Sequence, residues 1–166
     1  MGAMISFELA RRLRKKHNQL PVHLFLSGCR ALQFPDSSTV TYDLPDREFI
    51  EELRSLNGTP PEVLEHPELM QLLLPTLHAD FGVVQTYAYV SEPPLSCAMS
   101  IYGGLADPIL PREDLEGWRE QTTGMFSLRM FPGDHFFLLT ASQMLLDTMN
   151  QELQQHVNYS RSFAAQ

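Results

Sequence analysis

Cysteine, positive charge and long apolar stretches are all scarce in this sequence. Its two cysteines, Cys29 and Cys97, lie far apart, which excludes a zinc site and a disulfide framework and predicts reduced core thiols in a cytoplasmic protein. Lys and Arg number 12 against 20 Asp and Glu, and the net charge of −8 argues against nucleic acid as a partner, because phosphate binding needs a basic surface. No apolar run approaches the ~18 residues of a membrane-spanning helix, so no membrane partner is expected.

The sequence contains enough apolar material for one packed core. Hydrophobic residues make up 43% of the 166 residues and charged residues 19%, a balance that argues against disorder. A chain of this length usually forms one domain, which we expect over residues 1–157, followed by a frayed tail at 158–166.

The first ten residues are apolar almost all the way round a helix. They predict a buried helix, and the cations of residues 11–17 suit its carboxyl end, where they complement the helix dipole before Asn18 ends it. A secretory signal has its charges ahead of its apolar stretch, so the reversed order here excludes one. Two other interpretations stay open but are disfavoured: a mitochondrial leader, and N-myristoylation of the short pattern Met1-Gly2-x-x-x-Ser6.

Short apolar runs alternate with helical patterns along the rest of the chain. Three runs are typical of strands buried on both faces: 22–27, 96–102 and 126–131. Helical patterns occupy 46–90, as a stack of short pieces of which one starts at Pro75, and then 113–121 and 140–156. In the last of these, one face is formed by Leu145, Met149 and Leu153. Strands that alternate with helices indicate an α/β fold with a parallel sheet.

Polar residues follow two of these strands at their carboxyl ends, where the sites of parallel α/β sheets lie. Asp107 follows the second strand and His135 the third, and a helical crossover between the strands places both on the same rim. A carboxylate that accepts the Nδ1 proton of a histidine fixes its tautomer and leaves the other nitrogen as a general base. We therefore predict an Asp107–His135 pair, with Asp134 as a weaker rival partner and two ordinary turns as the alternative.

A pair of this kind needs a nucleophile. In α/β-hydrolases the order is Ser, Asp, His, and the serine lies in a Gly-x-Ser-x-Gly elbow between a strand and a helix. No such pentapeptide occurs in the chain, and the context is missing for Ser6, Ser27 and Ser100 alike.

Several ordered motifs over residues 1–139 resemble the carboxyl-terminal part of type II thioesterases, the stand-alone α/β-hydrolases that work with nonribosomal peptide and polyketide synthetases. The elbow of that family usually reads Gly-His-Ser-Met-Gly-Ala, and a helix close to Phe-Glu-Leu-Ala follows. The matching segments are Met1-Gly2-Ala3, Phe7-Glu8-Leu9-Ala10, Ser27-Gly28-Cys29-Arg30-Ala31, Leu56-Asn57-Gly58-Thr59-Pro60, Leu74-Pro75 with Leu77-His78-Ala79-Asp80-Phe81, Gly103-Gly104 with Asp107-Pro108, and Phe131 with Gly133 and His135-Phe136-Phe137. Two positions depart from the family: Leu32 replaces a proline, and His78 stands where arginine is more usual.

The resemblance implies a fold and a set of roles. The fold is a partial α/β-hydrolase: the last three parallel strands with their crossover helices, and a helical lid at about 46–90. Asp107 and His135 become the acid and base of a triad whose serine comes directly before Met1, and the Met1 backbone becomes a compromised oxyanion donor. The implied activity is hydrolysis of acyl thioesters on the phosphopantetheine arm of a carrier protein, with no cofactor and no metal ion.

The missing serine leads to two further expectations. The chain alone should have negligible thioesterase activity, because loss of one triad member disables the whole unit. It is then a truncated thioesterase, or half of a split enzyme whose amino-terminal half is a separate chain. The alternative function is a non-catalytic module that binds a carrier protein.

Overall fold

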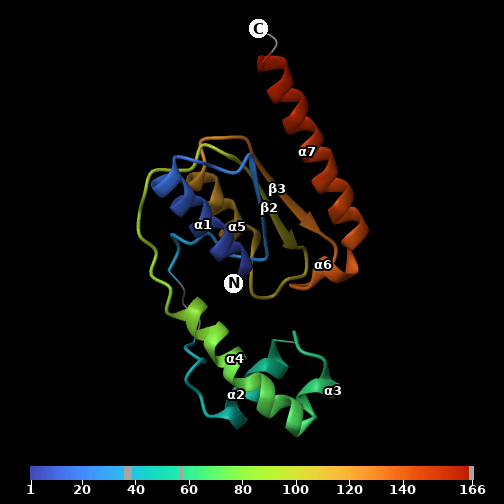
Figure 1. Ribbon diagram of the computed structural model, residues 1–166. Helices are drawn as coiled ribbons and strands as arrows, with labels where there is room; N and C mark the ends of the chain where they lie inside the picture. Colours follow the sequence, from blue (N-terminus) through green and yellow to red (C-terminus); the bar gives the residue numbers. More distant parts are fainter. Residues whose placement is uncertain (36–38, 57, 165–166) are drawn as a thin grey trace. The chain divides into compact units, whose positions relative to one another are not determined.

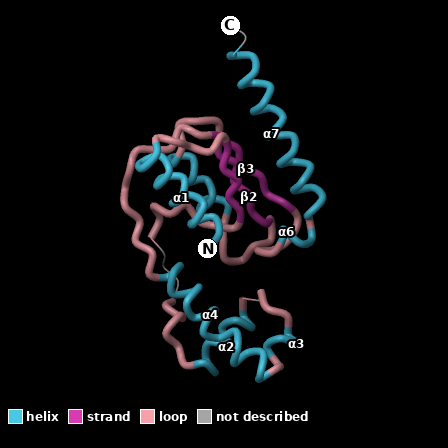
Figure 2. The backbone as a smooth tube through the Cα atoms, in the orientation of Figure 1, coloured by secondary structure: helices cyan, strands magenta, loops and turns pink. Residues whose placement is uncertain are grey.

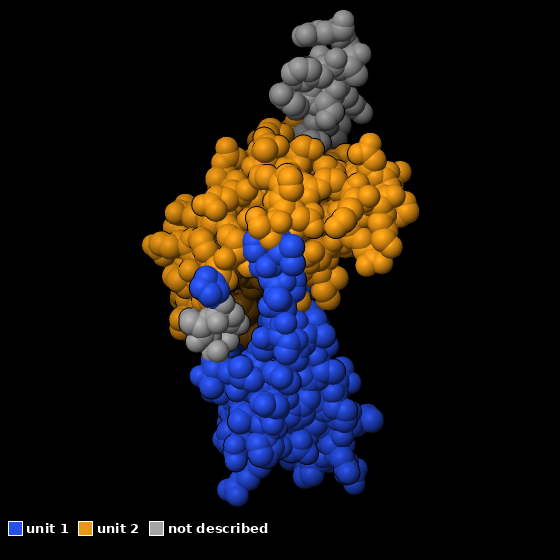
Figure 3. All heavy atoms as spheres, turned by 90° about the vertical axis from the view of Figure 1, so that its left-hand side faces the viewer, with its two compact units in different colours: residues 1, 35–90 blue, residues 2–34, 91–166 orange. Residues whose placement is uncertain are grey.

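The computed structural model describes residues 1–35, 39–56 and 58–164, with side chains as far as Gln155. It divides into two compact units (Figure 3): a helical unit of Met1 and Pro35–Val90, and a sheet unit of Gly2–Phe34 and Ser91–Gln166. Among the described residues, no helix combines the length and the apolar character needed to cross a membrane.

Three parallel strands form the sheet unit, as the sequence predicts. Their bounds are His23–Ser27 for β1, Ala98–Gly104 for β2 and Phe126–Phe131 for β3, in the spatial order β1-β2-β3 (Figure 1). Apolar side chains line up across the sheet, because Leu26 pairs with Ile101 and Ile101 pairs with Leu128. The central strand β2 is buried along its whole length.

β2 extends two residues beyond its predicted end at Tyr102. The prediction stopped at the glycine pair because glycine weakens strands. In the structure Gly104 pairs with Phe131, and its backbone lies so close to the carbonyl oxygen of Asp134 that no side chain fits between them. The loop that follows β3 passes directly over position 104, so only glycine fits at this end of β2.

Helices cover both faces of the sheet (Figure 2). On one face lie α1 (Gly2–His17) and α5 (Arg112–Glu116), which the 3₁₀ turn η1 (Gly117–Gln121) follows directly; on the other lie α6 (Phe137–Thr140) and α7 (Ser142–Ala164), as Figure 1 shows. Phe7 of α1 packs edge-on against Trp118 of η1, with ring centroids 5.0 Å apart, and both rings are buried. The segment predicted as one helix at 113–121 is therefore a short α-helix followed by a 3₁₀ turn.

α1 ends where the sequence predicts, because Asn18 adopts a left-handed conformation with φ 53°. Its inner face buries Met4, Phe7 and Ala10. Ile5 and Leu9 are 50% and 53% exposed, so the prediction that this helix is buried all round is wrong for the structure described here.

The carboxyl end of α1 is fastened to the segment that leads into β2. Arg11 and Arg14 each place an Nη2 atom near one carboxylate oxygen of Glu92, at 3.2 and 3.0 Å. Arg14 also donates through Nη1 to the carbonyl oxygens of Pro93 and Pro94, at 2.7 and 2.9 Å. Arg11 also donates through Nη1 to the Glu8 carboxylate at 2.6 Å, so the Glu92 carboxylate is one of several acceptors that hold the two guanidinium groups.

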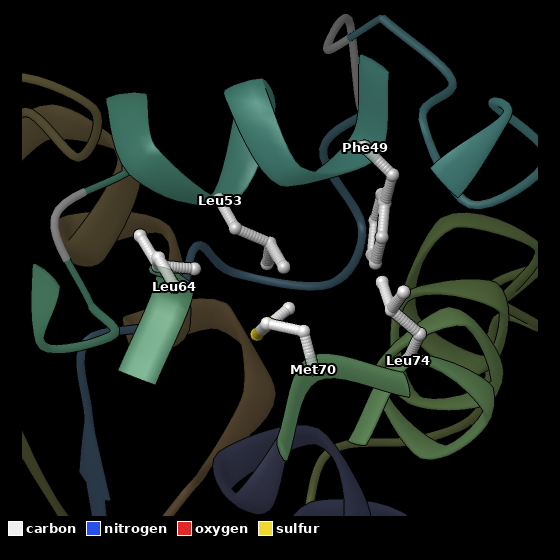
Figure 4. Close-up of a cluster of buried hydrophobic side chains, with 5 residues drawn as sticks. All are labelled: Phe49, Leu53, Leu64, Met70 and Leu74. Carbon is white, nitrogen blue, oxygen red and sulfur yellow. The ribbon is translucent and has the colours of Figure 1, made fainter. Parts of the chain in front are cut away.

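The helical unit has its own apolar core, shown in Figure 4. Its helices are α2 (Asp46–Ser55), α3 (Pro61–Leu64) and α4 (Pro67–Gln85), and the core side chains are Phe49, Leu53, Leu64, Met70 and Leu74. The prediction that a helix restarts at Pro75 is wrong, because α4 continues through it. A proline inside a helix removes one hydrogen bond, but burial of Leu74 and the packing of Leu77 on this core hold the helix together.

The last helix differs from the prediction in its bounds and in its buried face. α7 starts at Ser142, after the separate α6, and continues to Ala164, past the predicted end at residue 156. Leu145 is buried and Met149 packs beside it, as predicted. Leu153 is 38% exposed, however, and Glu152 is 8% exposed. The face that meets the sheet therefore includes a carboxylate.

Candidate active site

An aspartate and a histidine are in direct contact at the carboxyl ends of β2 and β3. His135 Nδ1 lies 2.7 Å from Asp107 Oδ2. Backbone pairing continues past both strands, since the N–H of Leu105 donates to Phe131 at 2.8 Å and that of Ala106 donates to Gly133 at 2.9 Å. These bonds hold the two loops side by side, and the structure thus brings together the two residues that the sequence analysis paired.

Both oxygens of the Asp107 carboxylate accept hydrogen bonds. Oδ1 accepts the backbone N–H groups of Ile109 and Leu110, at 2.9 and 3.2 Å, and Oδ2 faces the histidine. The side chain of Asp107 is 1% exposed and that of His135 is 35% exposed. Because a carboxylate only accepts, Nδ1 of His135 is the donor, and Nε2 is left to exchange protons with a reacting group.

The rival partner, Asp134, has a different contact. Its Oδ1 accepts the backbone N–H of Phe136 at 2.8 Å, which closes a tight turn around His135. Asp134 is exposed, whereas Asp107 is buried. The structure therefore assigns the imidazole to Asp107 and gives Asp134 a role in the shape of the loop.

Gly28, at the end of β1, faces the other edge of the imidazole, which the sequence analysis did not anticipate. A side-chain carbon at this position would lie 3.5 Å from Cε1 and 3.7 Å from Nε2 of His135. Gly28 has a φ of 58°, which a residue with a side chain adopts only with strain, and its N–H donates to Tyr102. A local signal exists in the Ser27-Gly28 step after a buried strand, but the neighbour across space is not encoded locally.

The oxyanion role of Met1 and the serine expected ahead of it stay predictions. Met1 groups with the helical unit, so its backbone is not placed relative to His135. The predicted nucleophile precedes Met1 and lies outside the sequence. Ser27 ends β1, and its Oγ is buried without a hydrogen-bond partner.

A serine–histidine contact lies away from this rim, nearer the amino ends of the strands, where His23 Nε2 is 2.8 Å from Ser100 Oγ. Both residues line a groove of about 780 Å³ together with Ser127, Arg129 and Glu152. Ser127 hydrogen-bonds to Glu152 and to Ser100, so the hydroxyl protons point toward the carboxylate and His23 acts as the donor. A base that must accept the serine proton is therefore not available in this pair.

Neither thiol of the chain is activated. Both cysteines are free, Cys97 is buried, and burial raises the pKa of both thiols, which keeps them protonated and weakly nucleophilic. Within the described residues no three His, Cys, Asp or Glu side chains are grouped so as to hold a metal ion. The chemistry of this edge of the sheet therefore rests on the aspartate and the histidine.

The family model of the thioesterase domain matches residues 1–153 of this chain. The chain belongs to the thioesterase family. Among curated relatives, the gramicidin S biosynthesis protein GrsT of Aneurinibacillus migulanus is 49% identical over 153 residues, with 92% of this chain and 60% of the relative covered. The linear gramicidin dehydrogenase LgrE of Brevibacillus parabrevis is 42% identical over 160 residues, with 95% and 61% covered.

Solved thioesterase structures share the fold. RedJ, a thioesterase of prodiginine biosynthesis in Streptomyces coelicolor, superimposes with a TM-score of 0.83 at 34% identity, with 91% of this chain and 60% of RedJ covered. ClbQ, from the colibactin NRPS/PKS pathway, superimposes with a TM-score of 0.86 at 28% identity, with 93% and 65% covered. The three-stranded sheet and its helices thus form part of an α/β thioesterase fold, as predicted. The chain spans about 60% of the length of the curated relatives it matches.

Proposed function

We propose that this chain supplies the acid and base of a serine thioesterase that hydrolyses acyl groups from the phosphopantetheine arm of a carrier protein. The observation that supports the proposal is the 2.7 Å contact between His135 Nδ1 and Asp107 Oδ2 at the carboxyl ends of adjacent parallel strands. In the proposed triad, Asp107 orients the imidazole and stabilises the imidazolium form during the reaction.

In this mechanism His135 moves one proton in each half-reaction. Nε2 takes the hydroxyl proton of the nucleophilic serine as its oxygen attacks the thioester carbonyl, and then gives that proton to the departing thiol. In the second half, Nε2 takes a proton from water as it attacks the acyl-serine and returns it to the serine oxygen. The products are a carboxylic acid and the free pantetheine thiol.

The nucleophile in this proposal is a serine directly ahead of Met1, the position that the family resemblance gives it. The α1 helix then follows the elbow, and the Met1 amide becomes one oxyanion donor when a peptide bond precedes it. The 166 residues assayed by themselves should turn over negligibly, because the serine is not among them.

The helical unit is proposed as the lid, at about 46–90, that takes up the acyl chain. α4 buries Leu74 in the core of this unit but leaves Leu72 74% exposed and Val83 50% exposed. Apolar side chains kept in solvent on a helix that already has a packed face suit a surface for an apolar ligand.

The names of the relatives support a carrier protein as the partner. GrsT is named for gramicidin S biosynthesis, and ClbQ comes from an NRPS/PKS pathway. We extend this setting to the present chain, and with it an editing role against wrongly loaded acyl groups. The two free thiols suit a reducing, cytoplasmic location.

The test compares two aspartates in the same site. The chain is extended ahead of Met1 with the amino-terminal part of a relative such as GrsT, up to and including its Gly-x-Ser segment, and hydrolysis of an acyl-loaded carrier protein is measured. Asp107→Asn should lower kcat by about four orders of magnitude, because the amide stabilises the wrong tautomer. Asp134→Asn keeps the oxygen that caps Phe136 and should retain activity. Equal activity of the two variants would overturn the assignment and leave a carrier-binding role to be examined.

A further inference from the structure

Glu152 of α7 is a buried carboxylate that the proposed mechanism does not use. It is 8% exposed, and the helix that carries it lies on the face of the sheet opposite α1 (Figure 1). Its Oε2 accepts the hydroxyl of Tyr102 on β2 at 2.6 Å, and its Oε1 accepts the hydroxyl of Ser127 on β3 at 2.8 Å. One side chain of the helix thus bonds to two strands, and a buried carboxylate has to be satisfied in this way to be tolerated.

Two further side chains, Ser100 and His23, continue the hydrogen bonding behind Ser127, and each donates toward Glu152. A hydroxyl has one proton, so when Ser127 donates to Glu152 it only accepts from Ser100, whose Oγ lies 3.0 Å away. Ser100 in turn accepts from His23 Nε2 at 2.8 Å. A row of donors from all three strands therefore points toward one carboxylate.

The ionised form of Glu152 is the form that this environment favours. Burial alone would raise the pKa of Glu152, but the surrounding hydroxyl donors and the charge of Arg129, 3.6 Å away, outweigh it and lower the pKa. Arg129 is 61% exposed, so it contributes less than a buried cation would. Burial and the contact with Glu152 raise the pKa of Tyr102, which keeps it a donor.

Tyr102 connects this carboxylate to the loop that holds His135. Its ring packs edge-on against Phe131 at 5.5 Å, and Phe131 stacks on Phe137 at 5.5 Å. Phe131 and Phe137 flank the His135 loop on either side, and the N–H of Phe137 donates to the carbonyl of Asp134. Leu145 of α7 completes the same buried cluster.

We propose that Glu152 is a positioning residue for His135. By accepting hydrogen bonds from Tyr102 and Ser127, it keeps α7 packed on the aromatic cluster of Tyr102, Phe131 and Phe137, which holds the His135 loop in place. The inference adds to the proposed function, which gives His135 its role, but the contacts themselves do not depend on it. Loss of the carboxylate should loosen α7 and, through Phe131 and Phe137, the loop at 132–137.

The test uses Glu152→Gln in the full chain of 166 residues. The amide keeps the shape but removes the charge and turns one acceptor into a donor facing Tyr102 or Ser127. Two readouts follow the loop: hydrogen exchange of peptides covering 132–137, and the downfield proton resonance of the hydrogen bond between His135 Nδ1 and Asp107. Exchange should accelerate about tenfold, the loss expected for a charged hydrogen bond, and the resonance should weaken or vanish.

Asp147→Asn is the matched control, because Asp147 is an exposed carboxylate on the same helix that bonds only to Gln143 among the contacts described for it. It should change neither readout. Tyr102→Phe keeps the ring in the cluster and should act like Glu152→Gln but more weakly, and it decides the question if the glutamine variant does not fold. Faster exchange confined to 142–155, with the resonance intact, would overturn the proposal and leave Glu152 as an anchor of α7. Neither readout needs turnover, so a failed thioesterase assay would not affect the result.

Discussion

The imidazole of His135 lies between a carboxylate and a residue without a side chain: Asp107 accepts the hydrogen bond of Nδ1, and the backbone of Gly28 faces the edge formed by Cε1 and Nε2. Gly28 directly follows β1, so the site draws on the ends of all three strands of the sheet and not only on the two that carry charged groups. Because glycine has no side chain, the Nε2 edge is left open on this side. The position therefore controls what can approach the base.

Gly28→Ala should impair both stability and catalysis. Alanine at a φ of 58° costs about 1–2 kcal/mol in backbone strain, and its methyl group would contact the atom that exchanges protons. We expect urea unfolding to shift by this amount and kcat of the extended, serine-containing chain to fall more than the stability loss explains. Unchanged kcat in the folded variant would show that the space beside Nε2 is not used.

Leu72 and Val83 should bind the acyl chain. They are eleven residues apart on α4, about three helical turns, and so lie on the same side of the helix. Leu72→Ser with Val83→Ser should raise KM for long-chain acyl thioesters up to about tenfold and leave acetyl thioesters unaffected, because only long chains bury apolar surface there. Leu146→Ser, at an exposed leucine of α7, is the control. A KM that rises equally for both chain lengths would contradict an acyl-binding surface.

The Asp107–His135 pair was predictable because its geometry follows from topology. Parallel strands put their carboxyl ends on one rim, so two polar residues after neighbouring strands meet whatever the details of packing.

The helix periodicity of α7 also carried information that the prediction did not use. Glu152 follows Leu145 by seven residues and lies within about 20° of it around the helix, whereas Leu153 lies about 80° away. The prediction placed the apolar residue inside, and the hydroxyl donors of two strands, which no local pattern encodes, decided otherwise.

At Gly28 and Pro75 the backbone structure also depends on tertiary contacts that local sequence patterns do not report. The approach of Gly28 to His135 joins residues far apart in sequence and depends on the completed sheet. Pro75 is a sound local signal for a helix boundary, yet packing of the neighbouring leucines outweighs the one hydrogen bond that proline removes. The local rule failed at Pro75 because tertiary contacts contribute more free energy there, and at Gly28 no local rule reports the neighbour across space.

Leu53→Ala should unfold the helical unit without unfolding the sheet unit. Leu53 is 4% exposed in the core of the helical unit, and the cavity should cost 2–5 kcal/mol, roughly the range for buried leucines. Hydrogen exchange of peptides from 46–85 should accelerate, whereas the unfolding transition of Trp118, the single tryptophan and a residue of the sheet unit, should not move. Leu145→Ala should show the reverse pattern. If both probes shifted together in each variant, the two units would form one cooperative structure.

Glu92→Gln should destabilise the sheet unit by about 1–2 kcal/mol at pH 7, because one carboxylate partner of two partly buried guanidinium groups becomes neutral. Urea unfolding followed by Trp118 fluorescence measures the change, since this ring packs on Phe7 of the same helix that Glu92 fastens. Glu51→Gln, in an exposed pair with Arg54 on α2, is the control and should have no measurable effect on this transition.

The pH dependence of the Glu92 effect separates an ion pair from simple packing. Burial alone would raise the pKa of Glu92, but the hydrogen bond from Arg14 and the charge of Arg11 outweigh it and lower the pKa in the folded state. A carboxylate with a lowered folded pKa contributes stability above its unfolded value, about 4.3, and loses that contribution as the pH falls through the folded value. The difference between the native chain and Glu92→Gln should therefore be full above about pH 5 and disappear on acidification. A difference that persisted undiminished at pH 3 would mean that the Glu92 side chain acts by its shape and not by its charge.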